Sequence, residues 1–249
     1  MAQLADIART SQRGYDWRTA LDWLRLLERL GEAAGDVAVS WRRWAAVEQG
    51  DILLTTGNTA AALQSFHIST DITARLAAAD PGNAEWQRNL SISHERIGDV
   101  LSVQGELPRA LDAYRDAMDI TARLAAADPG NAEWQRDLSF IHERIGIVLR
   151  AQGDLPGALA AYRAGLLIDE RLAREAPDNA QVQRDLFVSL REVARLSAST
   201  GDCAIARTAA AKAEAQARLL VQRFPHLPQH EDDLRGVKAL LEEIARLCP

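Results

Sequence analysis

The triplet His-Glu-Arg occurs twice in the chain, at residues 94–96 and 142–144. A histidine next to a glutamate on a helix suggests zinc-dependent hydrolysis, but that site requires a second histidine four residues after the first, and neither copy has one. We therefore predict a structural role for both triplets. Apolar residues three and four positions away indicate that His94 and His142 are neutral side chains packed on the buried face of a helix.

Two further groups carry side chains of the types that bind metals or attack substrates. His226 and His230 are four residues apart, but Pro225 and Pro228 break any helix that would bring the imidazoles to one face, so we expect a solvated linker and no metal site. No histidine is close in sequence to Cys203, which makes it a poor candidate nucleophile.

The two cysteines indicate neither a disulfide framework nor a zinc site. Cys203 and Cys248 are 45 residues apart and there is no second pair, so we predict two reduced, structural thiols. Glycine-rich phosphate loops, nucleophile elbows and paired-acid motifs are also missing from the sequence. The prediction is a protein that is not an enzyme, with no catalytic residue, no metal and no cofactor.

The elements that carry these residues follow from a repeat of 48 residues. Residues 71–88 are identical to residues 119–136 at all eighteen positions, and prolines recur at the same interval. These prolines are Pro81, Pro129, Pro177 and Pro225. A fixed period of a few tens of residues is typical of solenoids, in which each unit stacks on copies of itself.

Each 48-residue unit is predicted to be a hairpin of two helices of about 18–22 residues, because apolar residues recur every three or four positions on both sides of a glycine. The glycine, Gly105 in the second unit, ends the first helix, and an asparagine after the proline, such as Asn83, caps the next. Small residues such as Gly98 and Ala110 recur where the two helices must approach closely.

The pattern divides the chain into six segments. Residues 1–34 are a partial repeat or N-terminal cap, four repeats follow at 35–82, 83–130, 131–178 and 179–227, and residues 228–249 form a C-terminal capping helix. We expect the N-terminal helix, from about Tyr15 to Leu30, to expose Trp17, Trp23 and Leu27, because its helical partner is short. Exposed apolar patches usually meet another chain, so self-association through this helix is expected.

The second unit resembles the tetratricopeptide repeat family through Ile97-Gly98, Leu101, Gly105, Ala110, Tyr114 and Ala117. The third unit matches all of these positions except the last, with Ile145-Gly146, Leu149, Gly153, Ala158 and Tyr162. The resemblance implies an all-α, right-handed α-solenoid of antiparallel helical hairpins, here with an extended repeat. It also implies that the first helices line a concave groove. The groove positions of the four units are Trp44, Val47, Asp51 and Leu54; Ile92, Glu95, Asp99 and Ser102; Phe140, Glu143, Ile147 and Arg150; and Val188, Arg191, Arg195 and Ala198.

Acidic residues dominate the groove positions of the first two units and arginines those of the last two, which suits an extended ligand with a basic and an acidic end. The alternative is an ordinary solvated helical face. A net charge of −6 argues against a nucleic-acid partner. No apolar run reaches the length of a membrane span, and the N-terminus lacks the features of a signal peptide, so we expect a cytoplasmic protein without a membrane partner.

These observations favour a non-catalytic scaffold that binds a protein or peptide partner in the groove. A second hypothesis is a regulatory or sensor region of a larger bacterial signalling or effector protein, because near-identical long repeats of this kind occur in such proteins. A third hypothesis, an enzyme, has no set of residues to support it.

Overall fold

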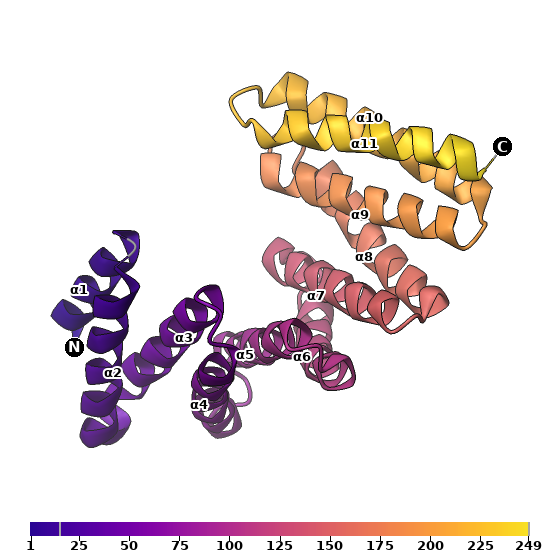
Figure 1. The fold of residues 1–249 in the computed structure, drawn as a ribbon. Coiled ribbons are helices and arrows are strands. Elements are labelled where there is room, and N and C mark those ends of the chain that lie inside the picture. The colour runs from indigo at the N-terminus through magenta and orange to yellow at the C-terminus, as the bar shows by residue number, and fades with distance from the viewer. Residues whose placement is uncertain (15, 249) are drawn as a thin grey trace. The chain divides into compact units, whose positions relative to one another are not determined.

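The computed structural model describes residues 1–14 and 16–248, which form eleven α-helices and one short 3₁₀ helix and contain no strand (Figure 1). The helices are α1 (Ala2–Arg13), α2 (Trp17–Ala34), η1 (Gly35–Ala38), α3 (Val39–Thr55), α4 (Thr59–Ala79), α5 (Ala84–Val103), α6 (Leu107–Ala127), α7 (Ala132–Ala151), α8 (Leu155–Glu175), α9 (Ala180–Ser199), α10 (Cys203–Arg223) and α11 (Gln229–Leu247). The prediction of an all-α fold is confirmed.

The chain divides into two compact parts, residues 1–124 and 125–249, and the division lies inside α6. We call these parts the first unit and the second unit, as distinct from the 48-residue repeats. In the first unit each helix from α1 to α4 packs against the next along the chain, and α4 packs against α5. In the second unit α7 packs on α8, α8 on α9, and α9 on α10. The helix α11 lies beside both α10 and α9, as the yellow and orange ribbons of Figure 1 show.

The helix ends form for local reasons that the repeat pattern anticipates. The side chains of Asn83, Asn131 and Asn179 each accept hydrogen bonds from backbone N–H groups in the first turn of the following helix. At the other end of the first helices, Gly105 has a φ of 77° and Gly153 a φ of 85°, a left-handed conformation that glycine adopts without strain. Both predicted signals are confirmed.

Close contact between the two helices of a hairpin depends on a glycine that faces an aromatic ring. A Cβ atom added to Gly98 would lie 2.6 Å from Cε1 of Tyr114, and one added to Gly146 would lie 2.7 Å from Cε1 of Tyr162. The fourth hairpin replaces both partners, because Ala194 and Ala210 stand at these positions and are fully buried. The smaller pair leaves room for α11, whose Leu240 and Ile244 pack into the same core cluster.

The N-terminal helix differs from its prediction. Leu27 is fully buried, and Trp17 and Trp23 pack partly buried against the core that α1 and α2 share. The twelve-residue α1 is long enough to cover this face, which removes the exposed patch on which the expectation of self-association was based. Tyr15, where the helix was predicted to begin, lies outside the described residues.

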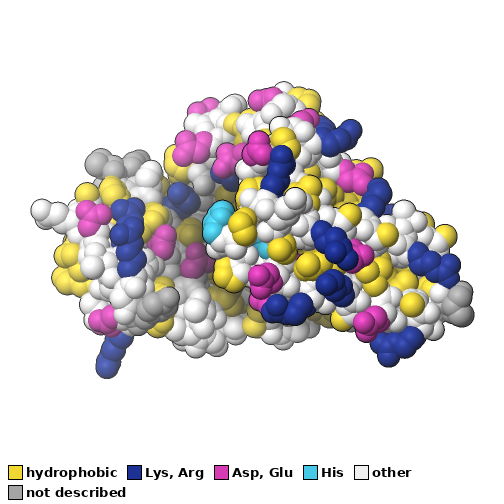
Figure 2. All heavy atoms as spheres, turned by 90° about the horizontal axis from the view of Figure 1, so that it is seen from above, with side chains coloured by type: hydrophobic (Ala, Val, Ile, Leu, Met, Phe, Trp, Pro, Cys, Tyr) yellow, Lys and Arg dark blue, Asp and Glu magenta, His cyan; other side chains and the backbone are white. Residues whose placement is uncertain are grey.

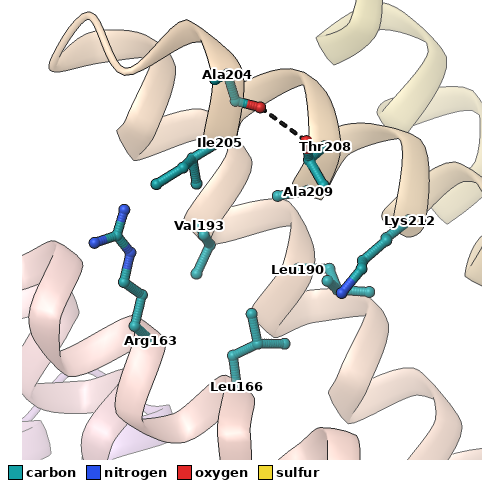
Figure 3. Close-up of a pocket in the computed structure, with 9 residues that line it drawn as sticks. All are labelled: Arg163, Leu166, Leu190, Val193, Ala204, Ile205, Thr208, Ala209 and Lys212. Atoms are coloured by element: carbon teal, nitrogen blue, oxygen red, sulfur yellow. Dashed lines mark hydrogen bonds between the residues drawn. The ribbon is translucent and has the colours of Figure 1, made fainter.

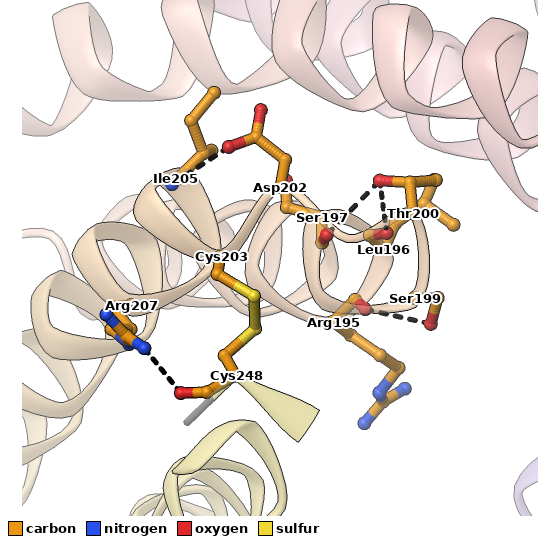
Figure 4. Close-up of a disulfide and its surroundings, with 10 residues drawn as sticks. All are labelled: Arg195, Leu196, Ser197, Ser199, Thr200, Asp202, Cys203, Ile205, Arg207 and Cys248. Atoms are coloured by element: carbon orange, nitrogen blue, oxygen red, sulfur yellow. Dashed lines mark hydrogen bonds between the residues drawn. A yellow bond between two sulfur atoms is a disulfide. The ribbon is translucent and has the colours of Figure 1, made fainter. Parts of the chain in front are cut away.

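The prediction of two reduced thiols is wrong, because Cys203 and Cys248 form a disulfide with their Cα atoms 5.4 Å apart (Figure 4). Cys203 is the first residue of α10 and Cys248 follows the last residue of α11, so the close packing of these two helices brings the residues together. The cytoplasmic location stays a prediction, and the disulfide bears on it because such bonds persist mainly in oxidising compartments.

The four histidines discussed above have different environments. His94 and His142 are half-buried, and burial lowers the pKa of both imidazoles, so the neutral form that was predicted is favoured. His226 is exposed, as expected for a linker. His230 is not, because only 1% of it is exposed, at the start of α11 and edge-on to the ring of Phe224.

The described residues contain neither a membrane-spanning helix nor a cluster of metal ligands. None of their helices is long and apolar enough to cross a membrane. Across the same residues, no group of three or more His, Cys, Asp and Glu side chains is arranged to hold a metal ion.

Candidate partner-binding surface

In the first unit, the groove positions of α3 and α5 form a small acidic cluster around one arginine. The guanidinium of Arg96 lies 3.6 Å from the carboxylate of Asp51 and 3.9 Å from that of Asp99. The hydroxyl of Tyr114, on α6, donates a hydrogen bond of 2.7 Å to Asp99. Two of the predicted groove acids therefore meet, and Arg96, which was not predicted, holds them together.

Burial raises the pKa of Asp51, while Arg96 opposes the shift and the carboxylates of Glu48 and Asp99 add to it. A second cation near these acids would relieve their mutual repulsion. The remaining predicted residues of α5, Ile92, Glu95 and Ser102, are half-buried.

Trp44, a predicted groove residue of α3, is half-buried in the first unit. Its ring packs against the N-terminal core, edge-on to Trp41 with 6.2 Å between the ring centroids. The guanidinium of Arg9, on α1, lies 4.7 Å from the centre of the Trp44 ring. Trp44 is thus engaged by α1 within the first unit. The other apolar groove residues predicted on α3, Val47 and Leu54, are half-buried.

In the second unit, three predicted arginines converge on one buried carboxylate. A guanidinium nitrogen of Arg150 lies 3.0 Å from Oε2 of Glu192, and nitrogens of Arg191 and Arg195 lie 3.0 Å and 3.5 Å from Oε1. Glu192 is 6% exposed, whereas the arginine side chains are between 28% and 47% exposed. We call Arg150, Arg191, Arg195 and Glu192 the arginine cluster.

The arginine cluster has three positive charges for one negative charge, so part of its positive charge is left without a partner within the cluster. A single carboxylate cannot satisfy the fifteen N–H groups that three guanidinium groups carry in total (five each). Guanidinium groups are planar forks that match carboxylates and phosphates, and half-exposed ones are available to a ligand.

A buried hydroxyl without a partner lies next to the arginine cluster. Tyr162 is 2% exposed and its hydroxyl has no hydrogen-bond partner, although the equivalent Tyr114 donates to Asp99. The reason is a change in the repeat, because Ile147 stands 48 residues after Asp99. Burial raises the pKa of Tyr162 to about 12, with Arg150 lowering it and Glu192 raising it, so the hydroxyl remains a proton donor at neutral pH.

The other predicted groove residues on α7 and α9 have mixed environments. Phe140 is 38% exposed, with the guanidinium of Arg144 at 4.5 Å from its ring centre. Burial raises the pKa of Glu143, and Arg144 partly offsets this. Ile147 packs partly buried against the core, Val188 is half-buried and Ala198 is buried.

Sequence reasoning found the arginines but missed the groups at the centre of both clusters. Glu48, Arg96, Arg144 and Glu192 occupy one position of the repeat, next to the predicted groove positions. The change in the sign of this residue's charge from one repeat to another was a signal that the sequence already contained. Figure 2 shows acidic and basic side chains interspersed over one face of the molecule. The net charge of the chain therefore does not reveal local clusters of one sign.

No protein-family model matches the chain, and no curated protein matches its sequence. Solved structures do match. BtubC from P. vanneervenii is 14% identical with a TM-score of 0.60, over 98% of this chain and 90% of that one. The apo form of RapI is 12% identical with a TM-score of 0.68, over 96% of this chain and 72% of that one.

A third match is a signal transduction ATPase with a tetratricopeptide repeat sensor from Pyrococcus horikoshii, which is 12% identical with a TM-score of 0.66. The similarity covers 96% of this chain but only 31% of the ATPase. These structures are tetratricopeptide repeat proteins, so the fold of this chain is a solenoid of tetratricopeptide type. At 12–14% sequence identity, these matches show that the fold is shared and do not show a shared function.

Proposed function

We propose that this protein is a non-catalytic scaffold of tetratricopeptide type, with an extended repeat of 48 residues, that binds a protein or peptide partner on its first helices. The arginine cluster receives an acidic group of the partner. The observation that supports this most is the convergence of Arg150, Arg191 and Arg195 on the single buried carboxylate of Glu192.

Glu192 gives the three arginines a fixed geometry, and its single carboxylate still leaves the cluster with an excess of positive charge. Three long side chains would otherwise lose much conformational freedom when they bind a ligand, and anchoring them in advance reduces that loss. Arginine is also among the residue types that most often contribute a large share of interface energy. The partner group that fits is a carboxylate of an acidic side chain or of a C-terminus.

The change from Asp99 to Ile147 between repeats supports the same conclusion. In the second repeat an internal carboxylate satisfies Tyr114, whereas in the third repeat no internal carboxylate satisfies Tyr162. A partner carboxylate that displaces the partly buried Ile147 side chain would meet the Tyr162 hydroxyl and the arginines together. The Asp51 and Asp99 pair on the first unit would by the same logic accept a basic residue.

The test is a binding assay with fluorescent peptides that contain leucine and glutamate, each compared with a peptide in which lysine replaces glutamate. Arg195→Ala and Arg150→Ala should each weaken binding of the acidic peptide by at least tenfold, consistent with ~2 kcal/mol for an interface anchor. Arg218→Ala is the matched control, because Arg218 is an exposed arginine of the same unit that pairs with Glu214. Binding should also weaken with salt.

The variant Ile147→Asp provides a second, independent test of the binding proposal. This substitution restores the residue that the second repeat has at this position, so the new carboxylate should bond Tyr162 and occupy the site from within. We expect an intact fold and weaker binding of the acidic peptide. Equal losses in the arginine variants and in Arg218→Ala, or unchanged binding by Ile147→Asp, would contradict the proposal.

A regulatory or sensor role within a larger signalling protein is the second candidate. It is favoured by the fold of the Pyrococcus horikoshii ATPase, in which a tetratricopeptide repeat sensor is part of a longer chain. An immunoblot of the native cells decides between the two, because a scaffold that consists of this chain alone has a mass of 27.3 kDa. A much larger band would favour the sensor.

A further inference from the structure

The second unit contains a cavity of about 320 Å³ between α8, α9 and α10 (Figure 3). Leu190 and Val193 of α9 line it together with Leu166 of α8 and Ile205 of α10. This volume is at the lower end of the range for small-molecule sites, about 300–1,000 Å³, and the predominantly apolar lining is also typical of them. The cavity involves none of the groove residues.

Three polar residues interrupt this apolar lining: Thr208, whose hydroxyl donates a hydrogen bond to the backbone carbonyl of Ala204, and two cations. Arg163 of α8 and Lys212 of α10 both line the cavity, whereas the acids with which they pair do not. Arg163 pairs with Asp202 and Lys212 with Glu170, so each ion pair joins α8 to α10. Asp202 and Lys212 are ten residues apart, about 15 Å along a helix, and the pairs therefore lie at opposite ends of the cavity.

The pair at the Arg163 end is weak. The closest distance between the two charged groups is 3.7 Å, and Nη2 of Arg163 is buried without a hydrogen-bond partner. Asp202 is engaged elsewhere, because its Oδ1 accepts a hydrogen bond from the backbone N–H of Ile205 and caps α10. A donor that lacks an acceptor at the edge of an apolar cavity fits a ligand with an apolar body and an acidic end.

The chemistry of this cavity is specific to the last repeat. The residues 48 positions before Leu190, Ile205 and Lys212 are His142, Gly157 and Ala164. Apolar bulk replaces a polar ring and a glycine, and a cation replaces alanine. These three changes together give the last repeat an apolar site with a basic rim.

We propose that this cavity binds a small apolar carboxylic acid, with its aliphatic body against Leu166, Leu190 and Val193 and its carboxylate at Arg163. The site is separate from the arginine cluster, because residues 190 and 193 are about 150° around α9 from residues 191 and 195, at 100° per residue. The two proposals can therefore fail independently.

The experiment is calorimetric titration of the whole chain with decanoate, with acetate and decanol as probes that lack the apolar body and the charge. Decanoate should bind at least tenfold more tightly than either. Leu190→His should remove this binding, and it should fold because His142 and His94 occupy the same position in the other repeats. Arg163→Gln, at a half-exposed site, should weaken decanoate binding at least tenfold and leave decanol unchanged.

Arg195→Ala is the control for the other face of α9 and should bind decanoate as the wild type does. The proposal is overturned if the wild type does not bind decanoate, if decanol binds equally well, or if Leu190→His binds decanoate as tightly as the wild type. Circular dichroism melts of each variant confirm that the fold is intact before these results are compared.

Discussion

The hydroxyl of Ser139 on α7 donates a hydrogen bond of 2.6 Å to Oδ1 of Asp169 on α8, deep in the second unit. Ser189 of α9 donates to the other carboxylate oxygen at 2.5 Å. Asp169 is 3% exposed and joins three helices through one side chain. The equivalent residue of the previous repeat, Thr121, bonds Ser91 in the same way but carries no charge.

Asp169→Asn should leave the free energy of unfolding at pH 7 unchanged or raise it. Burial raises the pKa of Asp169, so the ionised form is a cost to the folded state that the two hydroxyls only partly offset. The contribution of Asp169 to stability is largest at pH values below its ordinary pKa of 3.8, and it is lost as the pH rises through the folded-state pKa. In thermal melts between about pH 4 and pH 8, the melting temperatures of the wild type and of Asp169→Asn should therefore converge at the acidic end.

Asp169→Ala is the control, because it leaves the hydroxyls of Ser139 and Ser189 without their acceptor. It should lower stability by about 1–3 kcal/mol. If the asparagine variant is as unstable as the alanine variant at pH 7, the charge stabilises the fold and the argument is wrong.

His142→Leu should keep or raise the thermal stability, because a half-buried imidazole is replaced by the residue that the fourth repeat has at this position, Leu190. Burial lowers the pKa of His142. The neutral ring therefore contributes stability at pH values above the ordinary pKa of 6.5, and this contribution is lost as the pH falls through the folded-state pKa. The wild type should therefore lose more stability than the variant between pH 7 and pH 5. Parallel pH profiles would contradict this assignment.

Reduction of the Cys203–Cys248 disulfide should destabilise the second unit. The bond closes a loop of 45 residues, and the chain-entropy estimate for such a loop is about 4 kcal/mol. The melting temperature of the wild type should fall when a reductant is added. Cys248→Ser should melt at the lower temperature and be insensitive to the reductant, whereas a wild type that ignores the reductant would show that the pair is not bonded in solution.

Gly146→Ala should lower stability by about 1–3 kcal/mol, because the new methyl group would lie 2.7 Å from the Tyr162 ring. The fourth repeat accommodates an alanine here because Ala210 replaces the tyrosine. The double variant Gly146→Ala/Tyr162→Ala should therefore lose less stability than the two single variants together. A double-mutant cycle measures this coupling, and simple additivity would rule out the contact as the cause.

The helices and their ends could be predicted from the sequence because they depend on neighbouring residues. Apolar spacing, the asparagine caps and the glycines at helix ends act within a few residues, and the repeat presents each signal several times. The small residues at the hairpin contacts, such as Ala110 and Ala158, were predicted for the same reason and are fully buried. The predicted groove arginines depended on the resemblance to a known repeat.

The remaining features depend on how helices distant in the sequence pack together, and only the tertiary structure decided them. Cys203 and Cys248 meet because α10 and α11 lie side by side, and α1 covers the tryptophans that sequence reasoning left exposed. Glu192 gathers arginines from two helices, and the cavity needs walls from three. The sequence by itself determined the repeating hairpin, because its signals are local. The clusters, the disulfide and the cavity required the packing of helices that are distant in the sequence, which no local signal encodes.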